Sequence, residues 1–152
     1  MVPALLRVMA HSPAVLDGYL AIQESLEAGS LHKRLRYQIA LAVSQAAGSE
    51  YCVAAYTALG KSAGLSDEAL RDARVASSPD RRTDTALKFA RVLKKQSARE
   101  ASDHLFRLRQ AGFKESEIVE IVAHVMVVSL ANALYHLSDV AVDFPSIELK
   151  DG

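Results

Sequence analysis

The stretch RLRYQIALAVSQAAGSEYCVAAYTALGKSAGLSDEAL, residues 34–70, decides the fold. Its apolar residues recur at helical spacing, and no part of it alternates apolar and polar residues as a half-buried strand would. Gly48 and Gly64 stand where a helix can end in a left-handed turn. Ser49 and Ser66 follow these glycines closely, and serine is favoured at the first, capping position of a helix. The stretch therefore predicts three consecutive helices.

The rest of the chain has the same helical character. Further helices are expected at residues 3–9, 13–28, 84–95, 101–111 and 115–138, with the helix before Gly48 covering 31–47. SSPDRR (77–82) is expected to be a loop, and the tail DFPSIELKDG (143–152) to be irregular. The predicted fold is all-α: one single-domain bundle of seven or eight helices over residues 1–152, with a core motif at 31–70 and a second helical half at 84–140.

Composition excludes several classes of function. The chain has 18 basic residues (Lys and Arg) and 18 acidic residues (Asp and Glu), so its formal net charge is zero. This balance gives no reason to expect binding to nucleic acid, which needs a basic surface. A single cysteine excludes an intrachain disulfide, and the N-terminal segment lacks the pattern of a signal peptide. The most apolar stretch, residues 118–137, is interrupted by polar side chains, which favours a buried core helix over a membrane span. We therefore expect a cytoplasmic protein with no membrane partner.

The only cysteine, Cys52, lies near the start of an expected helix. If Ser49 caps that helix, the sulfur lies close to unpaired backbone N–H groups and to the positive end of the helix dipole. Both would stabilise a thiolate and lower the cysteine pKa below ~8.5. The alternative is an inert, buried cysteine in an alanine-rich helix. The segment by itself leaves both interpretations open.

Two segments carry a resemblance to a known family. Residues 34–70 resemble the core motif of the alkyl hydroperoxidase D (AhpD)-like and carboxymuconolactone decarboxylase family. The later segment LRQAGFKESEIVEIVAHVMVVSLANALYHLSDVAVDFP, residues 108–145, resembles the second half of AhpD-core proteins. The resemblance implies an all-helical fold that assembles through helical interfaces into a homo-oligomer, whether a dimer, a trimer or a hexamer.

The resemblance also implies a site. In the peroxidase members a Cys-x-x-Cys pair opens the motif helix, a histidine follows four residues later, and a glutamate lies on the preceding helix. The second cysteine attacks the peroxide, the first resolves it to a disulfide, and the glutamate and histidine handle protons. Here Cys52 matches the attacking cysteine, whereas Ser49, Tyr56 and Tyr37 stand where the resolving cysteine, the histidine and the glutamate would be.

These replacements change the expected chemistry. Oxidation of Cys52 could give a sulfenic acid, but an external thiol reductant would have to restore the thiol. Tyrosine is a poor general base at neutral pH, since its reference pKa is ~10. Tyr37 and Tyr56 can instead donate hydrogen bonds to a bound oxygen atom. The pocket is expected to be less charged than in the peroxidases.

Another residue could supply the missing base. Four polar residues share one face of the last expected helix: Ser129, Asn132, His136 and Asp139. His136 and Asp139 could handle protons as a pair, or the four residues could form a polar stripe at a subunit contact. His124 and Glu120, on a different face, have the same ambiguity. No metal-binding spacing and no glycine-rich phosphate loop occurs, so we expect neither a metal nor a cofactor.

Three functional hypotheses follow. The first is a thiol-dependent antioxidant oxidoreductase, a single-cysteine version of an alkyl hydroperoxidase, that reduces a small organic hydroperoxide through Cys52. The second is a family member without redox activity that binds a small apolar ligand in a pocket of Cys52, Tyr56 and Tyr37. The third is a lyase or isomerase of the decarboxylase type, in which Tyr37, Tyr56 or His136 handles protons.

Overall fold

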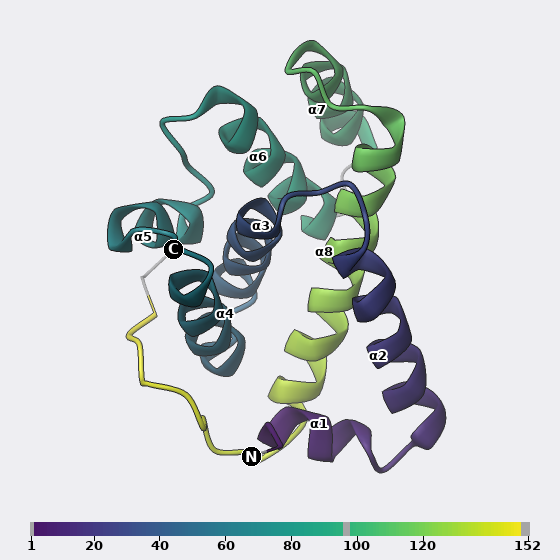
Figure 1. Ribbon diagram of the computed structural model, residues 1–152, viewed down its shortest axis with the longest axis vertical. Helices are drawn as coiled ribbons and strands as arrows, with labels where there is room; N and C mark the ends of the chain where they lie inside the picture. Colours follow the sequence, from purple (N-terminus) through teal and green to yellow (C-terminus); the bar gives the residue numbers. More distant parts are fainter. Residues whose placement is uncertain (1, 96–97, 150–152) are drawn as a thin grey trace.

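The computed structural model describes residues 2–95 and 98–149, which hold eight α-helices and no strand (Figure 1). The helices are α1 (Ala4–Met9), α2 (Pro13–Glu27), α3 (Lys33–Ala46), α4 (Glu50–Ser62), α5 (Asp67–Arg74), α6 (Arg81–Lys95), α7 (Ala98–Gln110) and α8 (Glu115–His136). The all-α prediction and the expected number of helices are confirmed.

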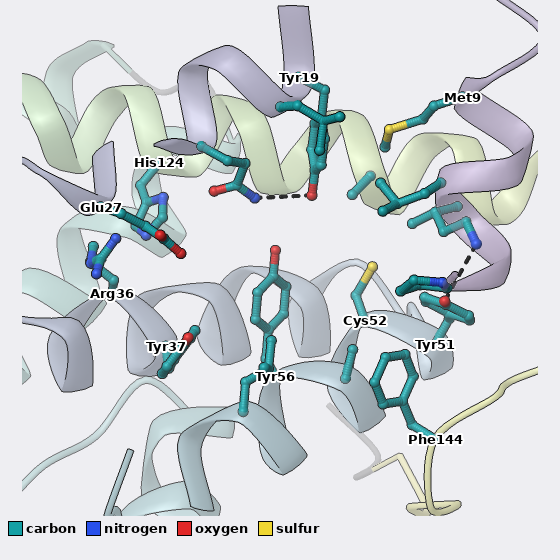
Figure 2. Close-up of a pocket in the computed structure, with 18 residues that line it drawn as sticks. Met9, Tyr19, Glu27, Arg36, Tyr37, Tyr51, Cys52, Tyr56, His124 and Phe144 are labelled. Atoms are coloured by element: carbon teal, nitrogen blue, oxygen red, sulfur yellow. Dashed lines mark hydrogen bonds between the residues drawn. The ribbon is translucent and has the colours of Figure 1, made fainter. Parts of the chain in front are cut away.

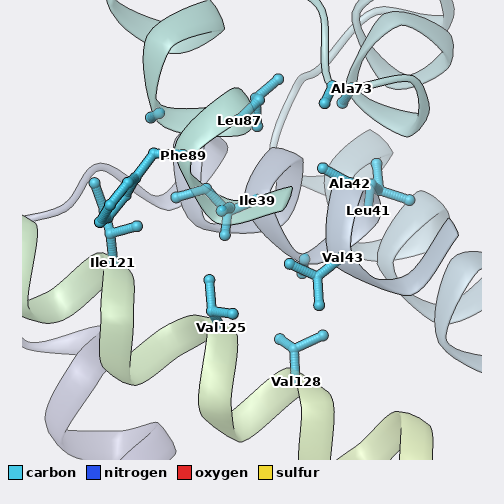
Figure 3. Packing of buried hydrophobic residues seen from close by; sticks show 14 of the residues in the cluster. Ile39, Leu41, Ala42, Val43, Ala73, Leu87, Phe89, Ile121, Val125 and Val128 are labelled. Carbon is cyan, nitrogen blue, oxygen red and sulfur yellow. The ribbon is translucent and has the colours of Figure 1, made fainter. Parts of the chain in front are cut away.

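Helix α3 is the centre of the bundle. It packs against α4, α5, α6 and α8, whereas α1 and α2 pack against α8 on the other side (Figure 1). Ile39 and Val43 of α3 face Val125 and Val128 of α8, and Leu87 of α6 closes the same cluster (Figure 3). All five side chains are fully buried, so the hydrophobic effect holds α3 between its neighbours.

The helix ends follow the sequence signals in the core motif. Gly48 and Gly64 end α3 and α4 with positive φ angles of 66° and 83°, a conformation that glycine adopts without a steric cost. The Ser49 hydroxyl accepts a hydrogen bond from the Cys52 backbone N–H, and the Ser66 hydroxyl accepts one from Ala69. Both predicted serine caps are therefore confirmed.

The loop predicted at 77–82 is shorter in the structure, because the next helix begins before residue 82. Helix α6 begins at Arg81, three residues before the predicted start at residue 84. Asp80 makes this possible, because its carboxylate accepts the Thr83 N–H at 2.8 Å and its carbonyl accepts the Asp84 N–H, also at 2.8 Å. Asp80 is thus an N-cap that the prediction treated as part of a loop. Helix α7 also begins three residues earlier than expected, at Ala98.

The C-terminal tail is irregular, as predicted, but it packs against the helices. It leaves the end of α8, passes the N-terminus and runs along α4 toward α5 (Figure 1). The Asp143 carboxylate accepts the Ala4 backbone N–H at 2.7 Å, and the Arg74 guanidinium donates to the Glu148 carbonyl. Ile147 packs against the main core. The tail thereby joins α1 to the α4–α5 side of the bundle.

The carboxylate of Glu120, on α8, holds the connection between α2 and α3. It accepts the backbone N–H groups of Ser30 at 2.9 Å and of Leu31 at 3.0 Å. Gly29 leaves the space for it, since a Cβ atom there would lie 2.7 Å from Glu120 Oε2. This contact fixes where α2 ends relative to α8.

Helix α8 is long and apolar enough to span a membrane, judged by length and composition alone. Among the residues that the structure describes, it is the only helix of this kind. One of its faces is the partner of α3 in the core, as Val125 and Val128 show. This packing favours the core-helix interpretation made from the sequence.

Glu120→Ala is expected to lower the free energy of unfolding by about 1–2 kcal/mol, because two backbone N–H groups lose a charged acceptor. Urea unfolding followed by circular dichroism measures this loss. Glu115→Ala is the matched control, since Glu115 lies on the same helix in an exposed pair with Arg109. An equal or larger loss for Glu115→Ala would contradict the role assigned to Glu120.

Candidate functional site

A cavity of about 310 Å³ lies between α1, α2, α3, α4, α8 and the tail (Figure 2). Its walls are mostly apolar, with tyrosines projecting into it from α2, α3 and α4. Cys52 and Tyr51 lie at one end, and Glu27, Arg36 and His124 lie at the other (Figure 2). A volume of this size suits a small ligand.

Cys52 is held in the wall by the first turn of α4. The Ser49 cap leaves the thiol one turn into the helix, and the cysteine is only 2 % exposed. Burial raises the pKa of the Cys52 thiol to about 11, although the hydrogen bond with Ser49 acts in the opposite direction. Of the two interpretations that the sequence leaves open, this burial favours the un-ionised thiol, because the cost of burying a thiolate exceeds the stabilisation at the helix start.

The Cys52 end is closed by aromatic rings. Phe144 of the tail meets the Tyr51 ring edge-on, with centroids 5.5 Å apart, and both line the cavity. The Tyr51 oxygen accepts the Leu5 N–H at 3.3 Å. Burial, followed by its hydrogen bond with Asp143, raises the pKa of Tyr51 to about 12. Helix α1, α4 and the tail are thus joined around the thiol.

Tyr56 stands in the middle of the cavity, with its hydroxyl pointing toward Tyr19 on α2 (Figure 2). Gln23 donates to the Tyr19 oxygen at 3.0 Å, and the Tyr56 phenol shares this hydrogen-bond group. Burial, and the neighbouring Tyr19 and Cys52, raise the pKa of Tyr56 well above its usual value. The phenol therefore stays neutral and can donate a hydrogen bond, but it cannot act as a base near pH 7.

The structure brings together three of the five residues predicted for the site. Tyr37 lines the cavity from α3, with its ring centroid 6.4 Å from that of Tyr56, and Cys52 lies on the same wall as Tyr56. Ser49 is fully buried behind the thiol and acts as the helix cap. It lies outside the cavity lining.

His136 lies away from this cavity. Its Nε2 atom is 2.7 Å from the Ala47 carbonyl at the end of α3, on an exposed side of α8. Asn132, one turn earlier, is buried, but its side-chain amide has no hydrogen-bond partner in the described parts of the chain. The Ser129 hydroxyl bonds to its own helix at the Val125 carbonyl. These three side chains therefore have different surroundings, and none of them lines the cavity.

Sequence reasoning missed the contribution of α2, which supplies Tyr19 and Gln23. No motif marks these residues, because α2 meets α4 across the cavity only through the tertiary fold. Arg36 of α3 also lines the cavity, and it is buried although it is a charged residue. The signal that could have placed it is its spacing: it stands four residues before Ala40 and seven before Val43, on a face that the core covers.

His124 lies near Arg36 at the polar end of the cavity. Burial, followed by the charge of Arg36, lowers the His124 pKa to about 4, although Glu120 acts in the opposite direction. The imidazole is therefore neutral near pH 7. Within residues 2–95 and 98–149, no three His, Cys, Asp or Glu side chains are placed to hold a metal ion.

A match to a protein family shows to which family the chain belongs. Residues 13–95 match the carboxymuconolactone decarboxylase family, over more than half of the chain. The chain belongs to the carboxymuconolactone decarboxylase family. The matched segment runs from α2 to α6, so it includes Cys52, Tyr56 and Tyr37, whereas α8 with His124 lies beyond it. No curated protein matches the chain significantly.

Several solved structures share the fold of this chain. An AhpD-core, peroxidase-related protein from Ralstonia eutropha is 25% identical, with a TM-score of 0.77 over 90% of this chain and 75% of that one. A protein of unknown function from Agrobacterium tumefaciens, proposed as an AhpD antioxidant defence protein, is 22% identical, with a TM-score of 0.75 over 82% and 88%. The debrominase Bmp8 in complex with 2,3,4-tribromopyrrole is 19% identical, with a TM-score of 0.79 over 94% and 78%.

The thiol of this carboxymuconolactone decarboxylase family member is expected to alkylate slowly near neutral pH. Because its pKa is raised to about 11, the rate with iodoacetamide should rise about tenfold per pH unit between about pH 7 and about pH 10. Mass spectrometry of quenched samples gives the rates. The same chain in denaturant is the control, where the inflection should return to about 8.5. A native inflection below that value would contradict the effect of burial.

Proposed function

We propose that this protein is a thiol-dependent antioxidant oxidoreductase that reduces a small, largely apolar organic hydroperoxide at Cys52. The observation that carries the proposal is the position of the thiol, which borders an apolar cavity beside neutral phenols. The family supports it, and so do the names of two solved relatives, one peroxidase-related and one proposed for antioxidant defence.

The proposed step is a two-electron transfer. The Cys52 sulfur attacks the terminal peroxide oxygen, which carries the hydrogen. An S–O bond forms and the O–O bond breaks, so the oxygen bound to carbon departs. The thiol proton ends on the departing oxygen, so the products are a cysteine sulfenic acid and an alcohol. With no second cysteine in the chain, an external thiol condenses with the sulfenic acid and releases water. A second external thiol then frees Cys52 and leaves as a disulfide.

The tyrosine hydroxyls are proposed to take over part of the role of the histidine and glutamate that this chain lacks, namely hydrogen bonding to the departing oxygen. Tyr56 donates a hydrogen bond to the departing oxygen, where negative charge develops, and Tyr19 and Gln23 orient its hydroxyl. Because burial raises the pKa of the Cys52 thiol to about 11, only a very small fraction of it is ionised at pH 7. The enzyme is therefore proposed to be slow at neutral pH and faster as the pH rises.

Cumene hydroperoxide is expected to convert the native protein to a form one oxygen atom heavier, which dimedone traps and Cys52→Ser abolishes. Tyr56→Phe should slow the oxidation about tenfold, because one hydrogen bond to the departing oxygen is worth about 1.4 kcal/mol. Mass spectrometry against time measures both effects. Tyr135→Phe is the matched control, since Tyr135 lies outside the cavity lining. No oxidation of Cys52 in the native protein would refute the proposed activity.

A second candidate function is the binding of a small apolar ligand without turnover. The raised pKa of Cys52 favours it, since a neutral thiol is a weak nucleophile. A structural relative, the debrominase Bmp8, was solved with 2,3,4-tribromopyrrole, a small ring compound. Ligand binding by a protein whose Cys52 resists peroxide would make this candidate the better one. The lyase or isomerase alternative loses support, because His136 lies outside the cavity and Tyr56 stays neutral.

We also propose that the protein forms a homo-oligomer through the face of α8 that turns away from α3. Four exposed apolar side chains spaced by four or seven residues make up this α8 stripe: Val119, Met126, Leu130 and Leu137. Such spacing suits packing against another helix, and the zero net charge adds no repulsion between copies.

Met126→Glu is expected to shift the protein to a smaller species, because it places a charge in the middle of the α8 stripe. Size-exclusion chromatography with light scattering measures the mass. Val75→Glu is the control, since Val75 is an exposed apolar residue at the end of α5, away from the stripe. A monomeric native protein, or an oligomer that Met126→Glu leaves intact, would rule out this interface.

A further inference from the structure

The charged guanidinium of Arg36 is buried, and no side chain of the described residues pairs with it. The side chain belongs to α3, lines the cavity, and the residue is only 8 % exposed. Its Nε atom is completely buried and has no hydrogen-bond partner among the residues that the structure describes. Across residues 2–95 and 98–149, its guanidinium makes neither a hydrogen bond nor an ion pair with another side chain. A buried charge without a partner is costly, so such groups are normally paired.

The charged and titratable groups around Arg36 do not satisfy it. Glu120 turns both carboxylate oxygens toward the backbone of the α2–α3 connection. Glu27 lines the same end of the cavity from α2 but is exposed and forms no ion pair with Arg36. His124, from α8, is 6 % exposed, and its buried Nδ1 atom has no hydrogen-bond partner in the described part of the chain. Two buried, unsatisfied polar side chains therefore border one end of the cavity (Figure 2).

The rest of the cavity is mostly apolar. Between this polar end and Cys52 the walls are apolar side chains and tyrosine rings, and Met9 of α1 lies at the Cys52 end (Figure 2). A ligand that satisfied both ends would carry one anionic group and an apolar body. A carboxylate fits the polar end, because its two oxygens match the paired N–H donors of one guanidinium. The modest volume favours a small acid.

We propose that Arg36 and His124 form a subsite for the carboxylate of a small amphipathic acid, whose apolar body extends toward Cys52. The carboxylate accepts hydrogen bonds from the Arg36 guanidinium, and the neutral His124 imidazole donates a further one. Taken with the proposed function, on which this last step rests, the substrate is the hydroperoxide of a short-chain or aromatic carboxylic acid. The subsite would hold the acid so that the peroxide group meets the thiol at the other end.

The test compares two probes that differ only in their polar group, octanoate and 1-octanol. Isothermal titration of the full native chain is expected to show octanoate binding at least tenfold more tightly than 1-octanol. Arg36→Gln should remove this preference by weakening octanoate alone. Arg34→Gln is the matched control, because Arg34 lies on the same helix but is exposed and bonds to the Ala63 carbonyl. It should leave both affinities unchanged.

Equal binding of octanoate and 1-octanol by the native chain would overturn the subsite, since Arg36 would then be satisfied without a ligand. A preference that survives in folded Arg36→Gln would overturn the assignment to Arg36. Circular dichroism checks the fold of each variant. If Arg36→Gln fails to fold, Arg36→Lys takes its place: this variant keeps the charge but loses the paired donors, and it should retain only part of the preference. The comparison of probes in the native chain decides the subsite in either case.

Failure of this proposal and failure of the proposed function are distinguishable. The octanoate titration contains no peroxide, so its outcome does not depend on whether Cys52 can be oxidised. Cumene hydroperoxide carries no carboxylate, so oxidation of Cys52 by it does not depend on Arg36. Oxidation without an octanoate preference would reject the subsite alone. An octanoate preference without oxidation would reject the redox function alone.

Discussion

The contact between α3 and α8 is the interaction on which the rest of the structure depends. Ile39 and Val43 on one helix meet Val125 and Val128 on the other with no exposure to water (Figure 3). This seam sets the direction of α3, and α4 turns back on α3 through a short, capped connection. The start of α4 is therefore placed beside α1 and α8, and the thiol of Cys52 enters a second apolar cluster between them.

The same burial determines the chemistry of the cavity. It raises the pKa values of Cys52 and Tyr56 and lowers that of His124, so each of these groups is neutral near pH 7. The cavity of this chain is therefore lined on these walls by neutral hydrogen-bonding groups. Such a site favours the binding and orientation of an apolar molecule over fast proton transfer. Reaction at the thiol is limited by the cost of ionising it.

Arg36 is the exception to this neutrality. Its guanidinium remains charged at the end of the cavity farthest from Cys52, beside an imidazole that burial keeps uncharged. Glu120, whose charge acts on His124, accepts the backbone N–H groups of the α2–α3 connection and forms no ion pair with Arg36. The polarity of the cavity runs along its length, from the charged end to the thiol.

Local signals in the sequence determined the helices and several of their ends, because caps and left-handed glycines act over three or four residues. Ser49, Ser66, Gly48 and Gly64 have the roles that their positions predicted. Asp80 shows the limit of such signals, since the same residue type caps a helix or belongs to a turn. The all-α class and the family also followed from the sequence, as did the position of Cys52 one turn into α4.

Only the tertiary structure decided what surrounds that cysteine. The side chains of the cavity come from five helices and the tail, and no spacing along the chain records that Tyr19 meets Tyr56 or that Arg36 is covered. His136 shows the reverse case, because its helical spacing suggested a site but the rotation of α8 turns it toward Ala47. The sequence places residues on the faces of helices, but the burial that sets a pKa depends on which faces the packing brings together. For that reason the sequence determined the fold and the position of the thiol in its helix. The packing determined which groups of the cavity are ionised and which side chains surround Cys52.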